Sequence, residues 1–290
     1  MRNRKPVLPA LLLGFFGLVL SAAAAPKGRL FIIGGGERSE SMMRKFVELA
    51  ALVKSGRIVV IPLSGDSPDE SGASMVAEFG KLGRTDTVVF NPTREQASKP
   101  ENALILDEAG GVYFTGGDQA RVTKVLLATP VHKKLIEIYE NGAVIGGTSA
   151  GAAIMSEIMI TGDEKRPPEA GHEFETLEAG QVLTTPGLGF IKTTIIDQHF
   201  ATRKRHNRLI SLIAENPSLL GVGIDEDTAI IVNPDKTFDV IGDKDVIVYD
   251  PSQTKVSVSP GKIIGLTGMI MHVLLPGARF DLKTRKVLTP

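Results

Sequence analysis

The chain has 290 residues, of which 42% are hydrophobic and 23% are charged, and its 33 basic residues balance its 33 acidic residues. This length is enough for one large domain with a sizeable core. The absence of net positive charge argues against nucleic acid or an anionic membrane surface as a partner. Because the chain has no cysteine, disulfides, cysteine-type zinc sites and thiol catalysis are excluded.

The first residues have the pattern of a secretory signal peptide. Residues 2–5 carry three basic side chains, residues 7–20 are apolar, and residues 23–25 are alanines that suit cleavage. The apolar run is too short and too interrupted by proline for a comfortable membrane span. We therefore expect residues 1–25 to be removed, no stable membrane anchor, and an exported protein, periplasmic or extracellular. Residues 26–290 are expected to form a single α/β domain.

Apolar, β-branched runs alternate with helical patterns after residue 26. This alternation predicts an α/β fold with a mostly parallel central sheet and helices on both faces. The expected strands are 29–33, 57–61, 87–90, 111–114 and 143–145, and the expected helices are 41–53, 69–82, 119–127 and 131–141.

Two glycine-rich turns follow expected strands. Gly116 and Gly117 open the helix at 119–127, and glycine there lets backbone N–H groups approach a ligand, so Gly117 is a candidate donor to an oxyanion. The plainer interpretation is a tight turn with Asp118 as the helix N-cap. Residues 34–36 are three glycines, but they lack the Lys-Ser/Thr of a Walker motif and the spacing of a dinucleotide fingerprint, so phosphate binding is weakly supported.

A serine between small residues follows the strand that ends at Ile145. The run Gly146-Gly147-Thr148-Ser149-Ala150-Gly151 precedes a helix expected over 152–159. This strand–turn–helix pattern is typical of a nucleophile elbow. The helix N-terminus, beginning with the N–H of Ala150, would face a developing oxyanion. An incidental serine in a tight turn fits the same residues, so the presence of a base decides between the two.

One histidine stands out as that base. His199 follows the expected strand 193–196, and the carboxyl ends of strands are where open α/β sheets bind ligands. The other four histidines lie in a surface helix, a polar segment, a basic cluster and an apolar run. A catalytic serine also needs a carboxylate to orient its base. Asp225, Glu226 and Asp227 follow the strand 220–224, and position favours Glu226 only weakly.

A basic cluster at 203–208 starts the next helix. At helical spacing Arg205 and Arg208 share a face, and Arg203 lies nearly opposite. Arginine forks suit carboxylates, so the cluster suggests an acidic substrate. A solvated helix face is the alternative.

The remaining segments carry no motif. Residues 164–178 are polar and contain proline, which predicts a surface excursion or flap. The close-spaced strands 220–224, 229–232, 238–241 and 246–249 are expected as antiparallel additions to the sheet.

Taken together, these residues resemble a known family. The segments that carry the resemblance are Gly116-Gly117-Asp118-Gln119, Gly147 to Ala152, Asp197-Gln198-His199-Phe200, the three spaced arginines and Asp225-Glu226. They resemble the cyanophycinases of the S51 serine peptidase family, whose fold is similar to that of class I glutamine amidotransferases. The resemblance covers roughly residues 30–232. The Asp-Gln-His-Phe segment with its arginines is more specific than the elbow, which peptidase E shares.

The resemblance implies a role for each matched residue. Ser149 would be the nucleophile, His199 the base and Glu226 its orienting carboxylate, with no metal or cofactor. The substrate would be cyanophycin, a poly-aspartate with arginine on each side chain, cleaved to β-aspartyl-arginine dipeptides. The family also suggests a homodimer. The implied substrate-pocket residues are Gln119, Asp197, Gln198, Arg203, Arg205 and Arg208.

Three alternatives remain open on the sequence. A peptidase of the same family could act on other β-aspartyl or short acidic peptides. An exported esterase of the α/β-hydrolase fold is less consistent, because there the carboxylate normally precedes the histidine in the chain. A non-catalytic binding protein would not need serine, base and acid together.

Overall fold

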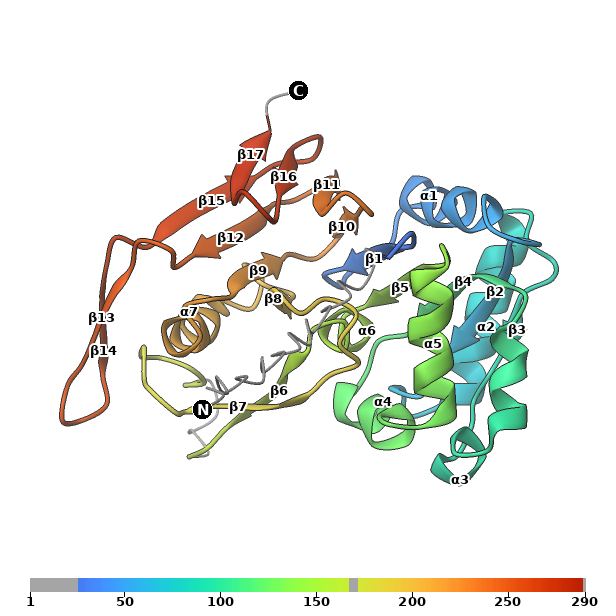
Figure 1. Ribbon diagram of the computed structural model, residues 1–290, viewed down its shortest axis with the longest axis horizontal. Coiled ribbons are helices and arrows are strands. Elements are labelled where there is room, and N and C mark those ends of the chain that lie inside the picture. Colours follow the sequence, from blue (N-terminus) through green and yellow to red (C-terminus); the bar gives the residue numbers. More distant parts are fainter. Residues whose placement is uncertain (1–25, 167–171, 289–290) are drawn as a thin grey trace, which may run out of the picture.

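The computed structural model describes residues 26–166 and 172–288. The expected signal peptide at 1–25, and part of the polar excursion, lie outside the described residues. Figure 1 shows a large helix-covered sheet on one side and a smaller sheet with its own helix on the other. No helix in the described ranges is long and apolar enough to cross a membrane.

The large sheet has nine strands and combines a parallel half with an antiparallel half. The strands β1, β5, β4, β2 and β3 run parallel to one another, and the strands beyond β1 on the other side are antiparallel. In order across the sheet they are β17 (Lys286–Leu288), β16 (Arg279–Asp281), β11 (Thr237–Gly242), β10 (Thr228–Val232), β1 (Arg29–Ile33), β5 (Val144–Thr148), β4 (Ala109–Phe114), β2 (Arg57–Ile61) and β3 (Val88–Val89).

Helices cover both faces of this sheet, as the alternation predicted. Alternate residues of a strand point to opposite faces, so Phe31 and Ile33 pack with the first two helices, and Leu30 and Ile32 face the others. The expected α/β fold class, with a parallel sheet covered by helices on both faces and antiparallel strands added late in the chain, is therefore confirmed. One face carries α1 (Glu40–Ala51) and α2 (Pro68–Lys81), and the other carries α3 (Arg94–Ala97), the 3₁₀ helix η1 (Pro100–Leu106), α4 (Gln119–Leu126), α5 (Pro130–Glu140) and α6 (Ala150–Ala153).

A second sheet of four strands stands beside the first. Four late strands were expected to extend the large sheet, but of these only β10 and β11 do so, and β9 and β12 belong to the second sheet. The helix α7 (His206–Glu215) packs on it through a small apolar core that includes Phe200 and Leu209. The strands, in order, are β15 (Ile270–Leu274), β12 (Val246–Asp250), β9 (Leu220–Ile224) and β8 (Thr194–Gln198), with β8 and β9 parallel.

The helix after Ser149 is much shorter than expected. α6 ends at Ala153, so the prediction of a helix over 152–159 was wrong. The apolar run is compatible with either structure, and tertiary contacts decide it: the Ser156 hydroxyl accepts the Ile196 N–H at 2.9 Å. Two hairpins complete the fold, β6 (Ile158–Glu164) with β7 (Val182–Pro186), and β13 (Lys255–Val258) with β14 (Ile264–Thr267).

The excursion between β6 and β7 rests on α7 in its described part. The Asn207 side-chain amide donates to the carbonyls of Phe174 and Glu175, both at 2.9 Å. The Glu178 N–H donates to the Ser211 hydroxyl at 3.1 Å. Residues 172–178 are therefore held against the helix that follows His199.

Candidate active site

Ser149 sits on a strained, tight turn between β5 and α6. Its φ of 53° is in a region that non-glycine residues rarely adopt. The turn is so close that a Cβ on Gly147 would lie 2.4 Å from the Gly151 carbonyl oxygen. The Ser149 N–H donates to the Ile33 carbonyl at 3.1 Å, which ties the turn to β1. The chain therefore forms the elbow expected from its sequence.

Three side chains form a continuous hydrogen-bonded chain at this elbow. The Ser149 Oγ lies 2.9 Å from His199 Nε2, and His199 Nδ1 lies 2.6 Å from Glu226 Oε1. With Nδ1–H donating to the carboxylate, Nε2 is free to accept the serine proton. This is the arrangement in which a base activates a nucleophile and a third group orients the base.

The structure distinguishes the three carboxylates that the sequence left open. Glu226 contacts His199, and its neighbours are used elsewhere. Asp225 Oδ1 accepts the Thr202 N–H at 2.9 Å. Asp227 accepts the Glu37 N–H at 2.6 Å and lies 3.3 Å from the Lys244 ammonium. The geometry therefore agrees with the weak positional preference for Glu226.

The three glycines after β1 hold the triad in place, a role that the sequence analysis missed. A Cβ on Gly35 would lie 2.2 Å from His199 Cε1, so only glycine leaves room for the ring. The Gly34 carbonyl accepts the His199 N–H at 2.7 Å, and the Gly35 carbonyl accepts the Asp227 N–H at 2.9 Å. The available signal was position, because these glycines end the strand next to β5.

Two backbone segments adjoin the serine, the start of α6 and the loop at Gly116. Ala150 is the first residue of α6, and the first N–H groups of a helix have no partner within it. On the other side, a Cβ on Gly116 would lie 3.5 Å from Ser149 Cβ. The loop that contains Gly116 and Gly117 therefore runs beside the nucleophile.

The three arginines are not arranged as helical spacing predicted. α7 begins at His206 with Arg205 as its N-cap, so the spacing from Arg203 is not helical. Arg208 is 3% exposed and forms a two-point ion pair with the fully buried Asp197 carboxylate, through Nε at 2.7 Å and through Nη2. Asp197, implied by the resemblance as a substrate-pocket residue, thus has both carboxylate oxygens engaged by Arg208.

The other two arginines remain near the triad. Arg205 donates to both the carbonyl and the side-chain oxygen of Gln198 at 2.8 Å. Arg203 is exposed, and its guanidinium has no hydrogen-bond or ion-pair partner among the described residues. Burial lowers the pKa of Arg205 to about 10, with the nearby charge of Arg208 as a second cause.

The charge state of His199 follows from its surroundings. Burial lowers its pKa below the ordinary 6.5, the hydrogen bond to Glu226 raises it in part, and the charges of Arg203 and Arg205 lower it again. The net direction is downward, so the imidazole is neutral at pH 7. A neutral imidazole is the form that a general base requires.

Gln119 lies near the site but is engaged with the fold. Its side-chain amide donates to the carbonyls of Ile160 and Thr161 at 2.9 and 2.8 Å, which fixes β6 beside α4. No group of three or more His, Asp or Glu side chains within residues 26–166 and 172–288 is placed to hold a metal ion.

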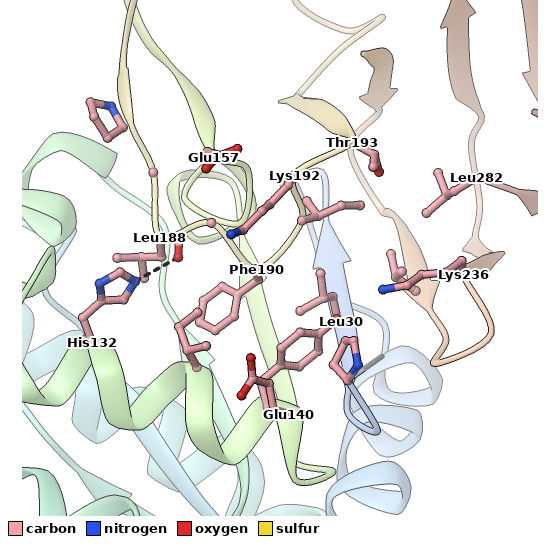
Figure 2. A pocket seen from close by; sticks show the side chains of 18 of the residues that line it. Leu30, His132, Glu140, Glu157, Leu188, Phe190, Lys192, Thr193, Lys236 and Leu282 are labelled. Carbon is pink, nitrogen blue, oxygen red and sulfur yellow. Dashed lines mark hydrogen bonds between the residues drawn. The ribbon is translucent and has the colours of Figure 1, made fainter. Parts of the chain in front are cut away.

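A pocket of about 700 Å³ lies away from the triad (Figure 2). Leu30 at the start of β1 lines it, together with Phe190 and Leu188, whose carbonyl is 2.9 Å from His132 Nε2. Charged side chains stand at its edge, among them Lys192 and Lys236. None of the triad residues lines this pocket, so it is separate from the candidate active site.

Comparison with known proteins shows which family this chain resembles. The model of peptidase family S51 matches residues 30–240. Proteins named cyanophycinase from Trichormus variabilis and from Nostoc sp. are each 33% identical over 296 residues, covering 99% of this chain and 95% of the relative. One from Synechococcus elongatus is 32% identical over 270 residues, covering 90% of this chain and 81% of the relative.

A solved structure shares the fold. The crystal structure of a peptidase from an acI-B1 actinobacterium superposes with a TM-score of 0.65 at 22% identity, covering 88% of this chain and 96% of that one. The family match extends from β1 into β11 and so includes every residue of the Ser149–His199–Glu226 chain. The protein belongs to peptidase family S51 and is a serine peptidase.

Proposed function

We propose that this protein is an exported cyanophycinase that works through Ser149, His199 and Glu226. The observation that carries the proposal is the hydrogen-bonded chain of these three side chains with Arg203 and Arg205 beside it. The relatives named cyanophycinase support the substrate, a polymer of aspartate carrying arginine. Export rests on the signal-peptide pattern of residues 1–25.

The proposed reaction begins with attack by Ser149 on the scissile amide carbonyl. His199 Nε2 takes the hydroxyl proton, and Glu226 stabilises the imidazolium that forms. His199 then returns the proton to the leaving amine, and water hydrolyses the acyl-enzyme by the same steps. The N–H groups of Ala150 and Gly117 would hold the oxyanion, each contributing about 3 kcal/mol to the transition state.

The arginines provide the proposed contacts with substrate carboxylates. Arg203 is exposed and unpaired within the described residues, and Arg205 presents its remaining donors beside Gln198. A planar guanidinium can bind a carboxylate through two parallel hydrogen bonds. Arg208 and Asp197 would contribute indirectly, by fixing α7 to the end of β8.

The decisive experiment compares the mature protein with Ser149→Ala on cyanophycin and identifies products by mass spectrometry. We expect aspartyl-arginine dipeptides from the wild type, and loss of hydrolysis with retained polymer binding in the variant. If the folded wild type releases nothing from the polymer but cleaves isoaspartyl peptides, the substrate assignment is wrong and the peptidase assignment stands.

Two further parts of the proposal need separate measurements. Export predicts that the protein recovered from periplasm or medium begins near Pro26, which N-terminal sequencing checks. A homodimer predicts twice the chain mass by light scattering after size exclusion.

A further inference from the structure

Ser64 is a buried hydroxyl with no part in the triad. It lies three residues beyond the end of β2 and is 1% exposed. Its Oγ is 2.8 Å from the Thr115 carbonyl oxygen, 2.8 Å from the Gly116 carbonyl oxygen and 3.2 Å from the Thr115 hydroxyl. Both carbonyls belong to the loop that runs beside Ser149.

These contacts set the direction of the peptide that joins Gly116 to Gly117. In a trans peptide the C=O and the N–H point in opposite directions, and the chain has no cis peptide in its described part. Because the Gly116 carbonyl faces the Ser64 hydroxyl, the Gly117 N–H points away from Ser64. That N–H has no protein hydrogen-bond partner within the described residues, so it is available to a ligand.

Without the Ser64 hydroxyl, the hydrogen bond that holds the Gly116 carbonyl in this direction is lost. Gly116 and Gly117 carry no side chains to resist rotation, and a rotated peptide would present a carbonyl oxygen where the N–H had been. An oxygen there repels a developing oxyanion instead of stabilising it. The Ser64 hydroxyl has one proton, which it shares between the two carbonyls, and this buried contact is therefore a means of keeping the loop in its productive state.

We infer that Ser64 is a positioning residue for catalysis, whose hydroxyl holds the Gly116 carbonyl so that the Gly117 N–H serves the oxyanion. This inference rests on the proposed function, because it needs Ser149 to form a tetrahedral adduct. The hydroxyl is separable from the rest of the contact. The Ser64 carbonyl accepts the Asp118 N–H at 2.8 Å, and this backbone bond persists in any side-chain variant.

The test uses a fluorophosphonate, which reports on the site without requiring cyanophycin. Ser149 Oγ bonds to phosphorus, fluoride leaves, His199 takes the serine proton, and the phosphoryl oxygen occupies the oxyanion position. Removing one such donor typically costs about 10²–10³ in rate. We expect Ser64→Ala, in the full mature chain, to be labelled about 10- to 100-fold more slowly, because part of the loop population keeps its direction. The rate for Ser64→Cys, a near-isosteric but weaker donor, should fall between.

A matched control separates positioning from general destabilisation. Thr129 is another buried hydroxyl, donating to the Leu126 carbonyl at 2.6 Å and capping α5. Thr129→Val removes it outside the site and should label at the wild-type rate despite a comparable fall in Tm. On a cleavable peptide, Ser64→Ala should lower kcat by the same factor as labelling and leave KM within about twofold, because only the transition state is affected.

The labelling rates of the Ser64 and Thr129 variants test whether Ser64 positions the loop. Wild-type labelling of Ser64→Ala would overturn the inference, and so would equal slowing in Thr129→Val or a loss confined to KM. If the wild type is labelled at Ser149 yet releases nothing from cyanophycin, the substrate proposal fails while the labelling rates still judge Ser64.

Discussion

Replacing Glu226 with glutamine isolates the charge behind His199. The 2.6 Å contact to Nδ1 can survive as a neutral hydrogen bond through the amide oxygen, so the geometry is kept and the charge is lost. During attack His199 becomes an imidazolium beside that carboxylate. Two unit charges about 4 Å apart interact by about 4 kcal/mol at an effective dielectric constant of 20, and both side chains are largely buried.

This energy converts directly into a rate. At 1.36 kcal/mol per decade, Glu226→Gln should lower kcat by up to about 10³-fold. The pH profile should move as well. Because Glu226 raises the pKa of His199 in the native site, its loss lowers that pKa further, and the acid limb of kcat/KM shifts to lower pH. A base whose pKa falls stays neutral in more acidic solution.

The assay is steady-state cleavage from pH 4 to 9, with Asp225→Asn as the matched control. Asp225 is the adjacent carboxylate, and its amide counterpart can still accept the Thr202 N–H. The control should keep both rate and pH profile. A loss below tenfold in Glu226→Gln, or an acid limb that moves upward, would refute the charge-stabilisation argument.

Two further predictions concern the basic cluster. Arg203→Gln removes a charge that lowers the pKa of His199, so the acid limb of kcat/KM should move to higher pH. Arg203→Lys keeps the charge and should leave the acid limb in place. Equal pH profiles for the two variants would contradict the electrostatic argument. Asp197→Asn leaves Arg208 charged and buried, which should cost about 3–5 kcal/mol in the free energy of unfolding, measured by urea denaturation. The double variant Asp197→Asn with Arg208→Met should recover part of that loss, and a single variant within 1 kcal/mol of wild type would show that the pair is not needed for stability.

The elbow and the doubly covered parallel sheet were predictable because they depend on local pattern. An apolar strand, two glycines and a small-residue turn have few alternative conformations. The triad carboxylate was harder, since Asp225, Glu226 and Asp227 are adjacent and only the turn, with Asp227 at a φ of 57°, decides which side chain faces His199. The glycines at 34–36 carried no recognisable motif, because their role lies in contacts with residues far along the chain.

Other features depend on tertiary pairing that composition does not encode. The run after Ala153 is as apolar as a helix would be, yet it continues into β6. Asp197 at a strand end and Arg208 in a helix are buried because they pair with each other. A charged residue considered alone is expected at the surface, so this burial could not be predicted from either position. The second sheet could not be foreseen, because strands such as β9 and β12 in that sheet and β10 in the first are all short runs buried along their whole length.

The path of the chain after His199 has a mechanical consequence. It passes from the second sheet at β9 to the first at β10 and β11, returns at β12 and β15, and crosses again to β16 and β17. These crossings stitch the two sheets together, and the seam between them lies where Ser149 of one meets His199 of the other. The alignment of nucleophile and base therefore depends on both sheets. Moving one sheet relative to the other would break strand pairings in each of them.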